Sequence, residues 1–310
     1  MPPALAYAMV FVGVIGHATS EFFAVLSGVQ GAEVSVWRYL IGAAGLLLVA
    51  LMRPATRDLW TPLKAEWRLL VPLSLIGVSL SYLAFHWALD FATIVQVGTM
   101  VTTVPIFVGL TNMVVNRMPI GGAKILTGVA AVAGVALLLT DGYLSRLAGD
   151  TDSLFGVLLA LGCAALGSIY AVLVKPLINT YGALRITTVS MSIGSLGLWI
   201  IVGIFWGIWV DPLTLSDKPL IAAWSLLILG IWNTTITQLV WFGGLAAVPD
   251  ITRGSYLFFL KPVITTALAL AILAQPITWV QVAAIVVICG SVLLEFIWPW
   301  MAARQARTRP

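Results

Sequence analysis

The sequence predicts an all-α integral membrane protein. Of the 310 residues, 61% are hydrophobic and only 9% are charged, and the mean hydropathy is +1.06. A soluble protein carries about 25% charged residues, so a soluble fold would have too few polar side chains here to cover its surface. The apolar stretches are long and do not alternate with polar residues, as the strands of a membrane β-barrel do. This composition excludes a soluble enzyme, a nucleic-acid-binding protein and a disordered chain.

Ten stretches are long enough to cross a membrane as helices, since one crossing takes about 20 mostly apolar residues. Short connections separate them and leave no room for a soluble domain. Asp90 and Asp250 precede the fourth and ninth stretches, and we predict that they cap these helices. The ten predicted spans are Leu5–Leu26, Val34–Met52, Leu69–Trp87, Thr93–Val115, Ile120–Thr140, Leu154–Val174, Ile186–Trp209, Leu220–Gly243, Ile251–Leu273 and Ile277–Trp298.

The distribution of Lys and Arg predicts how the spans are oriented. If the N-terminus lies in the cytoplasm, most of the 16 basic residues fall in cytoplasmic connections or in the C-terminal tail, which is the usual bias of membrane proteins. The first charged residue is Glu21, so the first stretch lacks the basic flank of a cleaved signal peptide. We therefore predict a multi-pass protein of the cytoplasmic (inner) membrane with both termini in the cytoplasm.

The two halves of the chain share a weak internal repeat. A shift of 157 residues aligns Pro105 with Pro262 and Pro119 with Pro276, at matching places in the last two spans of each half. With five spans per half, the second half starts on the opposite side of the membrane. Inverted repeats of this kind occur in many secondary transporters, whose substrate site lies near the membrane midplane. We predict two inverted five-helix repeats, residues 1–148 and 149–310, packed as one membrane domain.

Two short segments carry a family resemblance. Trp37–Leu40 reads Trp-Arg-Tyr-Leu in the second span, and Phe258–Val263 reads Phe-Phe-Leu-Lys-Pro-Val in the ninth, with Gln275-Pro276 downstream. Together with the ten spans and the duplication, these segments resemble the drug/metabolite transporter superfamily, and in particular its EamA-type branch. One departure is that Ala274-Gln275 stands where the family often has Gly-Glu, so no role of that glutamate carries over.

The resemblance implies a secondary transporter that exports small amphipathic metabolites, above all amino acids, aromatic ones included, by alternating access. We expect a monomer that contacts membrane lipids and takes a small-molecule substrate, without a cofactor or bound nucleic acid. Cys163 and Cys289 lie far apart inside apolar stretches, so the sequence offers no disulfide framework and no metal site. It also lacks the motifs of soluble catalytic sites, and we expect no enzyme.

Two other functions stay open at this point. A multidrug or cation efflux pump would need a carboxylate in its cavity, so the orientation of Glu21 would decide. An intramembrane lipid-modifying enzyme would need paired titratable groups, whereas His17, Glu21 and Lys261 belong to separate spans.

Polar and aromatic residues inside the spans are the candidates for a substrate site, because polar groups at mid-membrane are costly and tend to face the protein interior. In the eighth span, Thr234, Gln238 and Trp241 recur at helical spacing and form either a cavity wall or hydrogen bonds between helices. Threonines of the fourth span either line the cavity or bond to their own helix. The candidate substrate-binding residues are Ser81, Tyr82, Gln96, Thr99, Thr103, Tyr170, Thr234, Gln238, Trp241, Tyr256, Phe259 and Lys261.

Three ionisable residues within the spans have alternative interpretations. Glu21 either pairs with Arg38 or binds a proton or cation, and His17 is either a neutral hydrogen-bonded residue or part of the same ion site. Lys261 lies too deep to reach either membrane surface, so we expect it to face inward. There its ammonium would bind a free carbonyl near Phe258, a substrate carboxylate, or a polar group of the first or eighth span.

Overall fold

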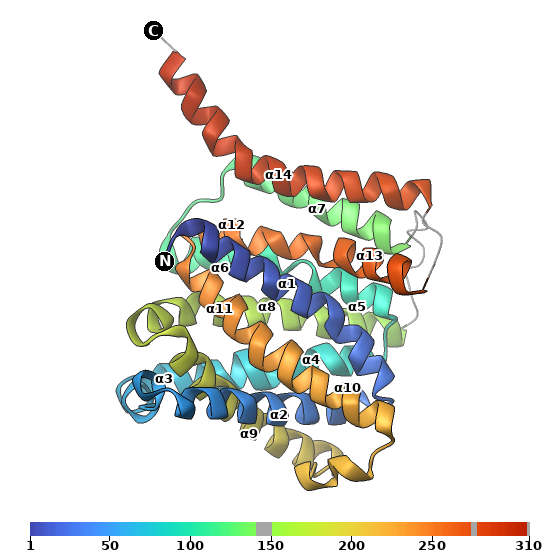
Figure 1. Ribbon diagram of the computed structural model, residues 1–310. Helices are drawn as coiled ribbons and strands as arrows, with labels where there is room; N and C mark the ends of the chain where they lie inside the picture. The colour runs from blue at the N-terminus through green and yellow to red at the C-terminus, as the bar shows by residue number, and fades with distance from the viewer. Residues whose placement is uncertain (141–150, 274–277, 309–310) are drawn as a thin grey trace.

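The structure, a computed structural model, describes residues 1–140, 151–273 and 278–308, and these ranges contain helices and no strands (Figure 1). Within these ranges, nine segments are long and apolar enough to cross a membrane. The prediction of an all-α integral membrane protein is therefore confirmed. The predicted boundary at 148/149 and the residues Ala274–Pro276 lie outside the described ranges. Six predicted spans are single helices: α1 (Pro3–Leu26), α2 (Gly31–Met52), α7 (Gly122–Thr140), α8 (Thr151–Tyr181), α9 (Ala183–Trp206) and α14 (Trp279–Thr308).

The other four predicted spans are each divided into shorter helical segments. The third consists of α3 (Trp60–Ser74), the π-helical turn η2 (Leu75–Leu80) and α4 (Ser81–Ala88), and the fourth of α5 (Ile94–Val101) and α6 (Val104–Asn116). The eighth consists of α10 (Leu220–Gly230), the π-helical turn η5 (Ile231–Ile236) and α11 (Thr237–Ala247). The ninth consists of α12 (Ile251–Ser255), the 3₁₀-helix η6 (Tyr256–Leu260) and α13 (Lys261–Leu273). Short 3₁₀-helices η1 (Pro54–Thr56) and η4 (Pro212–Asp217) lie in connections.

The same irregularities recur in both halves of the chain. The π-helical turns η2 and η5 interrupt the third and eighth spans, and α6 and α13 begin one residue before Pro105 and Pro262. Proline has no backbone N–H and is favoured at a helix start. The positions of the two π-helical turns and of the two helix starts agree with the 157-residue shift to within one residue. The two-repeat organisation stays a prediction, and this recurrence agrees with it.

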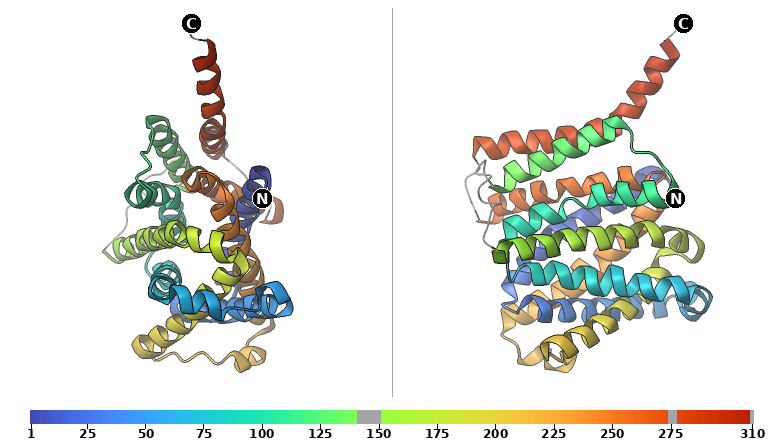
Figure 2. Two further views of the ribbon diagram at one scale, coloured as in Figure 1. Left: turned by 90° about the vertical axis from the view of Figure 1, so that its left-hand side faces the viewer. Right: turned by 180° about the vertical axis from the view of Figure 1, so that it is seen from behind.

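The helix packing also relates the two halves. Helix α1 packs on α10 and α11, and α8 packs on η2 and α4, so the first span meets the eighth and the sixth meets the third. Helix α2 packs on α9, and α7 packs on α14. The α7–α14 pair lies at one edge of the helix bundle in both views of Figure 2. Exchanging the two predicted repeats leaves this set of pairings unchanged.

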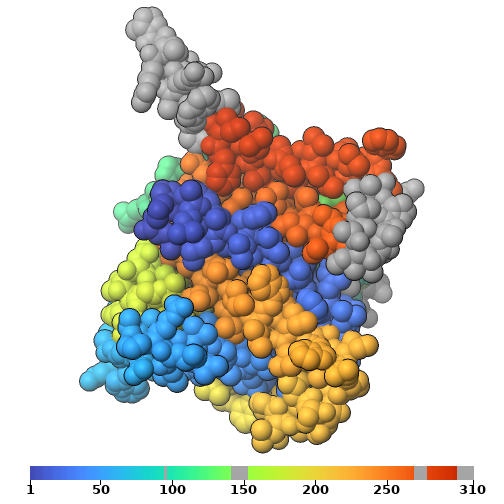
Figure 3. All heavy atoms as spheres, in the orientation of Figure 1, coloured from blue at the N-terminus to red at the C-terminus, as the bar shows by residue number. Residues whose placement is uncertain are grey.

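Glycines let the backbones of α1 and α11 approach closely. A Cβ added to Gly244 would lie 2.8 Å from the backbone nitrogen of Val10 and 2.9 Å from the carbonyl oxygen of Ala6. Small residues permit such crossings in membrane proteins, where van der Waals packing replaces the hydrophobic effect between helices. Figure 3 shows α1 lying directly beside the eighth-span helices on the face turned to the viewer.

The two predicted helix caps have different outcomes. The prediction for Asp250 is confirmed, since its carboxylate accepts hydrogen bonds from the backbone N–H groups of Thr252 and Arg253 at 3.0 and 3.2 Å. Burial tends to raise the pKa of Asp250, but the hydrogen bond and charge of Lys124 outweigh this and hold that pKa below its ordinary value. The prediction for Asp90 is wrong. Thr93 caps α5, and Asp90 instead accepts a hydrogen bond from the Gly31 N–H at the start of α2.

Candidate functional site

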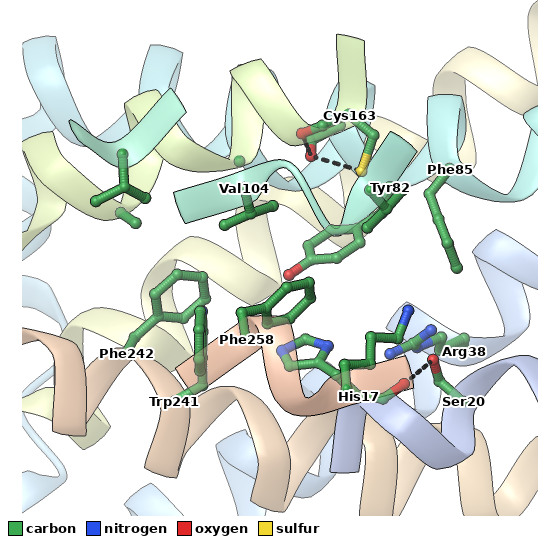
Figure 4. A pocket seen from close by; sticks show the side chains of 16 residues that line it. His17, Ser20, Arg38, Tyr82, Phe85, Val104, Cys163, Trp241, Phe242 and Phe258 are labelled. Atoms are coloured by element: carbon green, nitrogen blue, oxygen red, sulfur yellow. Dashed lines mark hydrogen bonds between the residues drawn. The ribbon is translucent and has the colours of Figure 1, made fainter. Parts of the chain in front are cut away.

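A central cavity lies where the interrupted helices meet, and it holds about 60 Å³ of space for water (Figure 4). It draws side chains from both halves of the chain. Irregular helices at membrane depth are tolerated where they are buried in protein or line a cavity, and they often mark functional sites. The lining residues are His17, Ser20, Arg38, Ser81, Tyr82, Phe85, Val101, Val104, Val108, Cys163, Gly167, Ala171, Trp241, Phe242, Phe258 and Lys261.

A buried ion pair forms part of the cavity wall. The Lys261 ammonium at the start of α13 donates to the Glu21 carboxylate of α1, and Ser20 donates to the same carboxylate at 3.3 Å. Glu21 is 7% exposed and Lys261 is 5% exposed. The expected pair between Glu21 and Arg38 is therefore wrong. The neighbouring helix start at Lys261-Pro262 brings the lysine, and not the arginine, to the carboxylate.

The Lys261–Glu21 pair lies next to a second cavity. Lys261 lines the central cavity, and both Lys261 and Glu21 line a smaller cavity of about 50 Å³ beside it. Its remaining lining residues are Gly98, Thr102, Leu139, Pro262 and Thr265. The Lys261 ammonium lies 5.7 Å from the ring centroids of Phe85 and Phe258, within the range of cation–π attraction.

Arg38 of α2 is a second buried cation at the central cavity. It is 1% exposed. Its guanidinium donates from Nε to the Thr234 hydroxyl at 3.1 Å and from one terminal nitrogen to the Asn233 carbonyl at 3.0 Å. Both acceptors belong to the π-helical turn η5. The eighth span therefore fixes the position of the guanidinium through neutral groups.

His86 of α4 is the third partner of Arg38. The second terminal nitrogen of the guanidinium lies 3.4 Å from His86 Nε2. Because a guanidinium can only donate, Nε2 must be the accepting nitrogen. Nδ1 then carries the proton and donates to the Tyr82 carbonyl at 3.0 Å, close to Ser35 Oγ at 2.7 Å. This tautomer makes His86 neutral.

The side chains of His17, Trp241 and Phe258 form a cluster of rings in the cavity lining. His17 lies edge-to-face on Trp241 and on Phe258, with ring centroids 5.4 and 5.5 Å apart. The Trp241 and Phe258 centroids are 5.3 Å apart. In Figure 4, Trp241 and Phe242 lie at one end of the cavity and Arg38 and Ser20 at the other, with His17 and Phe258 between them. Arg38 and Trp241 thus lie at opposite ends of the cavity.

The structure brings some of the predicted site residues together. Ser81, Tyr82, Trp241, Lys261 and His17 line the central cavity. Glu21 lines the neighbouring cavity through its ion pair with Lys261.

Eight predicted site residues lie outside the cavity lining. Gln96 completes the capping box of α5, Thr99 is buried on the same helix, and Thr103 donates to the Met100 carbonyl. Thr234 accepts from Arg38, so it contacts the cavity indirectly. The others are buried and pack between helices: Tyr170 on Phe242, Gln238 on α11, and Tyr256 against Phe259 beneath α7 and α14.

Sequence reasoning missed the cavity role of several residues. Arg38 was considered only as a partner of Glu21, although an arginine in a predicted span is a signal for an interior site. Phe85, Phe242 and Phe258 carry no such signal, because aromatic residues in spans are common packing residues.

In many secondary transporters the substrate site lies between discontinuous helices of this kind. The model of the EamA-like transporter family matches residues 4–140 and 154–297, and the chain belongs to this family. The resemblance to EamA-type members of the drug/metabolite transporter superfamily is thereby confirmed.

Curated relatives and a solved structure agree with this assignment. An "Uncharacterized transporter" of Clostridium kluyveri is 24% identical over 93% of this chain and 92% of its own length. "Uncharacterized transporter YvbV" of Bacillus subtilis is 26% identical over 83% and 79%. A crystal structure that is 18% identical superposes with a TM-score of 0.75 over 94% of this chain and 98% of its own, which shows that the fold is shared.

Proposed function

We propose that the protein is a secondary transporter that exports small amphipathic metabolites, above all amino acids and aromatic ones among them, across the cytoplasmic membrane. The observation that carries this proposal is the central cavity, which places a buried cation opposite a cluster of aromatic rings. A small molecule with a polar head and an apolar side chain matches this arrangement. The direction of transport rests on the family resemblance.

Alternating access is part of the proposal. The central cavity holds about 60 Å³ of space for water, which is room for a few water molecules and not for an amino acid. Binding therefore requires helices around the cavity to move apart. We take residues 1–148 and 149–310 as the two moving units. The recurrent helix breaks and the two separate family matches support this division.

We further propose that the transporter works as a monomer with both termini in the cytoplasm. The N-terminus and the last turns of α14 lie on the same side of the helix bundle in Figure 1. An even number of crossings, such as the ten predicted ones, requires this arrangement. The bias of basic residues then assigns that side to the cytoplasm.

The alternative functions have less support. A cation efflux pump needs a carboxylate that is free to bind its substrate, whereas the Glu21 carboxylate is engaged by Lys261. A lipid-modifying enzyme would have to use the same ion pair and His17 as its acid and base groups. Membership of a transporter family favours transport over catalysis.

Counterflow in proteoliposomes tests the proposal. Purified protein is reconstituted with an unlabelled amino acid inside, and uptake of the same radiolabelled amino acid is measured across a panel that includes Phe, Tyr and Trp. We expect uptake for apolar or aromatic members. We expect Trp241→Ala to lower it about tenfold, because the ring provides contact area that alanine lacks.

The matched control is Trp60→Ala, since Trp60 lies at the exposed start of α3, away from the cavity. Uptake by this variant should equal that of the wild type. Failure of the wild-type protein to move any member of the panel would refute amino-acid transport.

A further inference from the structure

The charges around the central cavity do not balance. Arg38, Lys261 and Glu21 are the buried charged side chains at this site. Lys261 and Glu21 neutralise each other. Within the part of the chain that the structure describes, no ion pair includes Arg38. One positive charge therefore remains at the cavity.

The Arg38 guanidinium is held in place and still has donors to spare. Three of its five N–H groups bind Thr234, Asn233 and His86, which leaves one N–H on each terminal nitrogen. Two neighbouring N–H groups of a guanidinium match the two oxygens of a carboxylate.

A buried charge without a counter-charge is costly. The groups that surround Arg38 lower this cost with hydrogen bonds but supply no negative charge. His86 is neutral in the tautomer that its contacts define, and the ring of Tyr39, whose centroid lies 5.4 Å from the guanidinium carbon, offers only its π-electrons. An anion that enters the cavity would provide the missing charge.

We propose that Arg38 binds the carboxylate of the transported substrate, whose apolar or aromatic side chain then lies toward Trp241 and Phe258. This inference rests on the proposed transport function and names the ligand class and the anchoring residue of the same cavity. In this arrangement Lys261 neutralises Glu21 and does not bind the substrate carboxylate. Figure 4 shows Arg38 and Trp241 at opposite ends of the cavity, with His17 and Phe258 between them, so the helices must move apart before a ligand can lie along this axis.

The test begins with wild-type protein and four probes that share one ring: L-phenylalanine, 3-phenylpropanoate, L-phenylalaninamide and phenethylamine. Binding is measured as the ligand-induced rise in melting temperature in detergent, and transport as counterflow in proteoliposomes. We expect both carboxylates to bind, and the amide and the amine to bind at least tenfold more weakly. Equal binding of the amide or the amine, neither of which has a carboxylate, would overturn the proposal, as would stronger binding of inorganic phosphate.

The two measurements separate the two claims. Carboxylate-selective binding without counterflow of any probe would refute transport of these substrates and leave the Arg38 site intact. Counterflow without preference for carboxylates would leave transport intact and refute the Arg38 site. Absence of both binding and counterflow for all four probes would overturn both claims.

Substitutions then locate the selectivity. Arg38→Met should weaken binding of the carboxylates about ten- to a hundredfold, the range expected when a hydrogen-bonded charge contact is lost. Arg38→Lys keeps the charge without the planar fork, so its binding should be intermediate. It also keeps the proposal testable if Arg38→Met does not fold. The matched control is Arg185→Met, which removes a guanidinium that pairs with Asp58 outside the cavity. Carboxylate binding by an Arg38 variant at wild-type strength would refute the assignment.

Discussion

At the residue scale, the Lys261–Glu21 pair joins the two halves of the chain beside the two cavities. A buried ion pair adds little stability relative to well-packed apolar residues, because both charges lose their hydration. Removing only one partner is much worse, since the other charge is left buried and unpaired. Double substitution therefore distinguishes a structural pair from a contact that the substrate needs.

The first prediction concerns this pair. Glu21→Gln and Lys261→Met should each destabilise the protein by about 3–5 kcal/mol, measured as a lower melting temperature in detergent. The double variant should recover much of that loss, because no unpaired charge remains. If the pair is only structural, the double variant should keep counterflow of carboxylates. If Lys261 also contacts the substrate, the double variant should lose this counterflow. Additive losses in the double variant would contradict the pairing itself.

Much of the site's chemistry could be predicted from residue types, but not its pairing. The inward orientation of Lys261 is confirmed by its burial, and it follows from depth alone. Which cation meets Glu21 depends on the rotation of α1, α2 and α13 about their axes. The sequence places Arg38 and Glu21 near the same predicted membrane surface and therefore favours Arg38 as the partner of Glu21. The structure pairs Glu21 with Lys261 instead. Because Glu21 pairs with Lys261, its carboxylate does not neutralise Arg38.

At the scale of elements, the sequence predicted continuous spans where the structure has interrupted ones. Pro105 and Pro262 did mark the starts of α6 and α13, because proline cannot donate within a helix. The π-helical turns η2 and η5 had no comparable signal. One extra residue in a turn shifts the helical phase, but the shift cannot be recognised in a span that is apolar on nearly all sides. These turns nevertheless matter for the site, since η5 presents the groups that hold Arg38.

The second prediction concerns the crossing of α1 and α11. Gly244→Ala should destabilise the protein by about 1–3 kcal/mol, the usual range for overpacking, because the new methyl group would meet the backbone of Ala6 and Val10. Backbone atoms cannot turn away as a flexible side chain can. The measurement is the melting temperature in detergent.

The control for this prediction is Gly162→Ala within α8, where an added Cβ meets no atom within 4 Å. Alanine there should be neutral or stabilise the helix by up to about 1 kcal/mol. Equal melting temperatures for the two variants would show that α1 and α11 do not approach as closely as the structure places them.

At the scale of the whole molecule, composition and periodicity were sufficient for the fold class and for most span positions. They could not give the partners of each span, because the lipid-facing and protein-facing sides of these uniformly apolar helices look alike in sequence. The packing of α7 on α14 and of α2 on α9 is therefore known only from the structure. The ribbon shows that the N-terminus and the last turns of α14 lie on the same side of the helix bundle. The assignment of that side to the cytoplasm rests on the distribution of basic residues alone.

The last prediction tests that assignment. Single cysteines are introduced at Ala55, Met118 and Ser216 in a background with Cys163→Ala and Cys289→Ala. All three positions are exposed and uncharged, so the changes leave the basic residues that set the topology in place. Ala55 lies between α2 and α3, Met118 between α6 and α7, and Ser216 between α9 and α10.

A membrane-impermeant maleimide added to intact cells should label the protein only through the cysteine at 216. In inverted vesicles it should label the cysteines at 55 and 118 and leave that at 216 unmodified. This pattern follows because the first two positions lie on the side of the N-terminus, whereas the third is separated from them by an odd number of predicted crossings. The reverse pattern would place the N-terminus outside and contradict the distribution of basic residues. Labelling of all three from one side would contradict the predicted crossings between them.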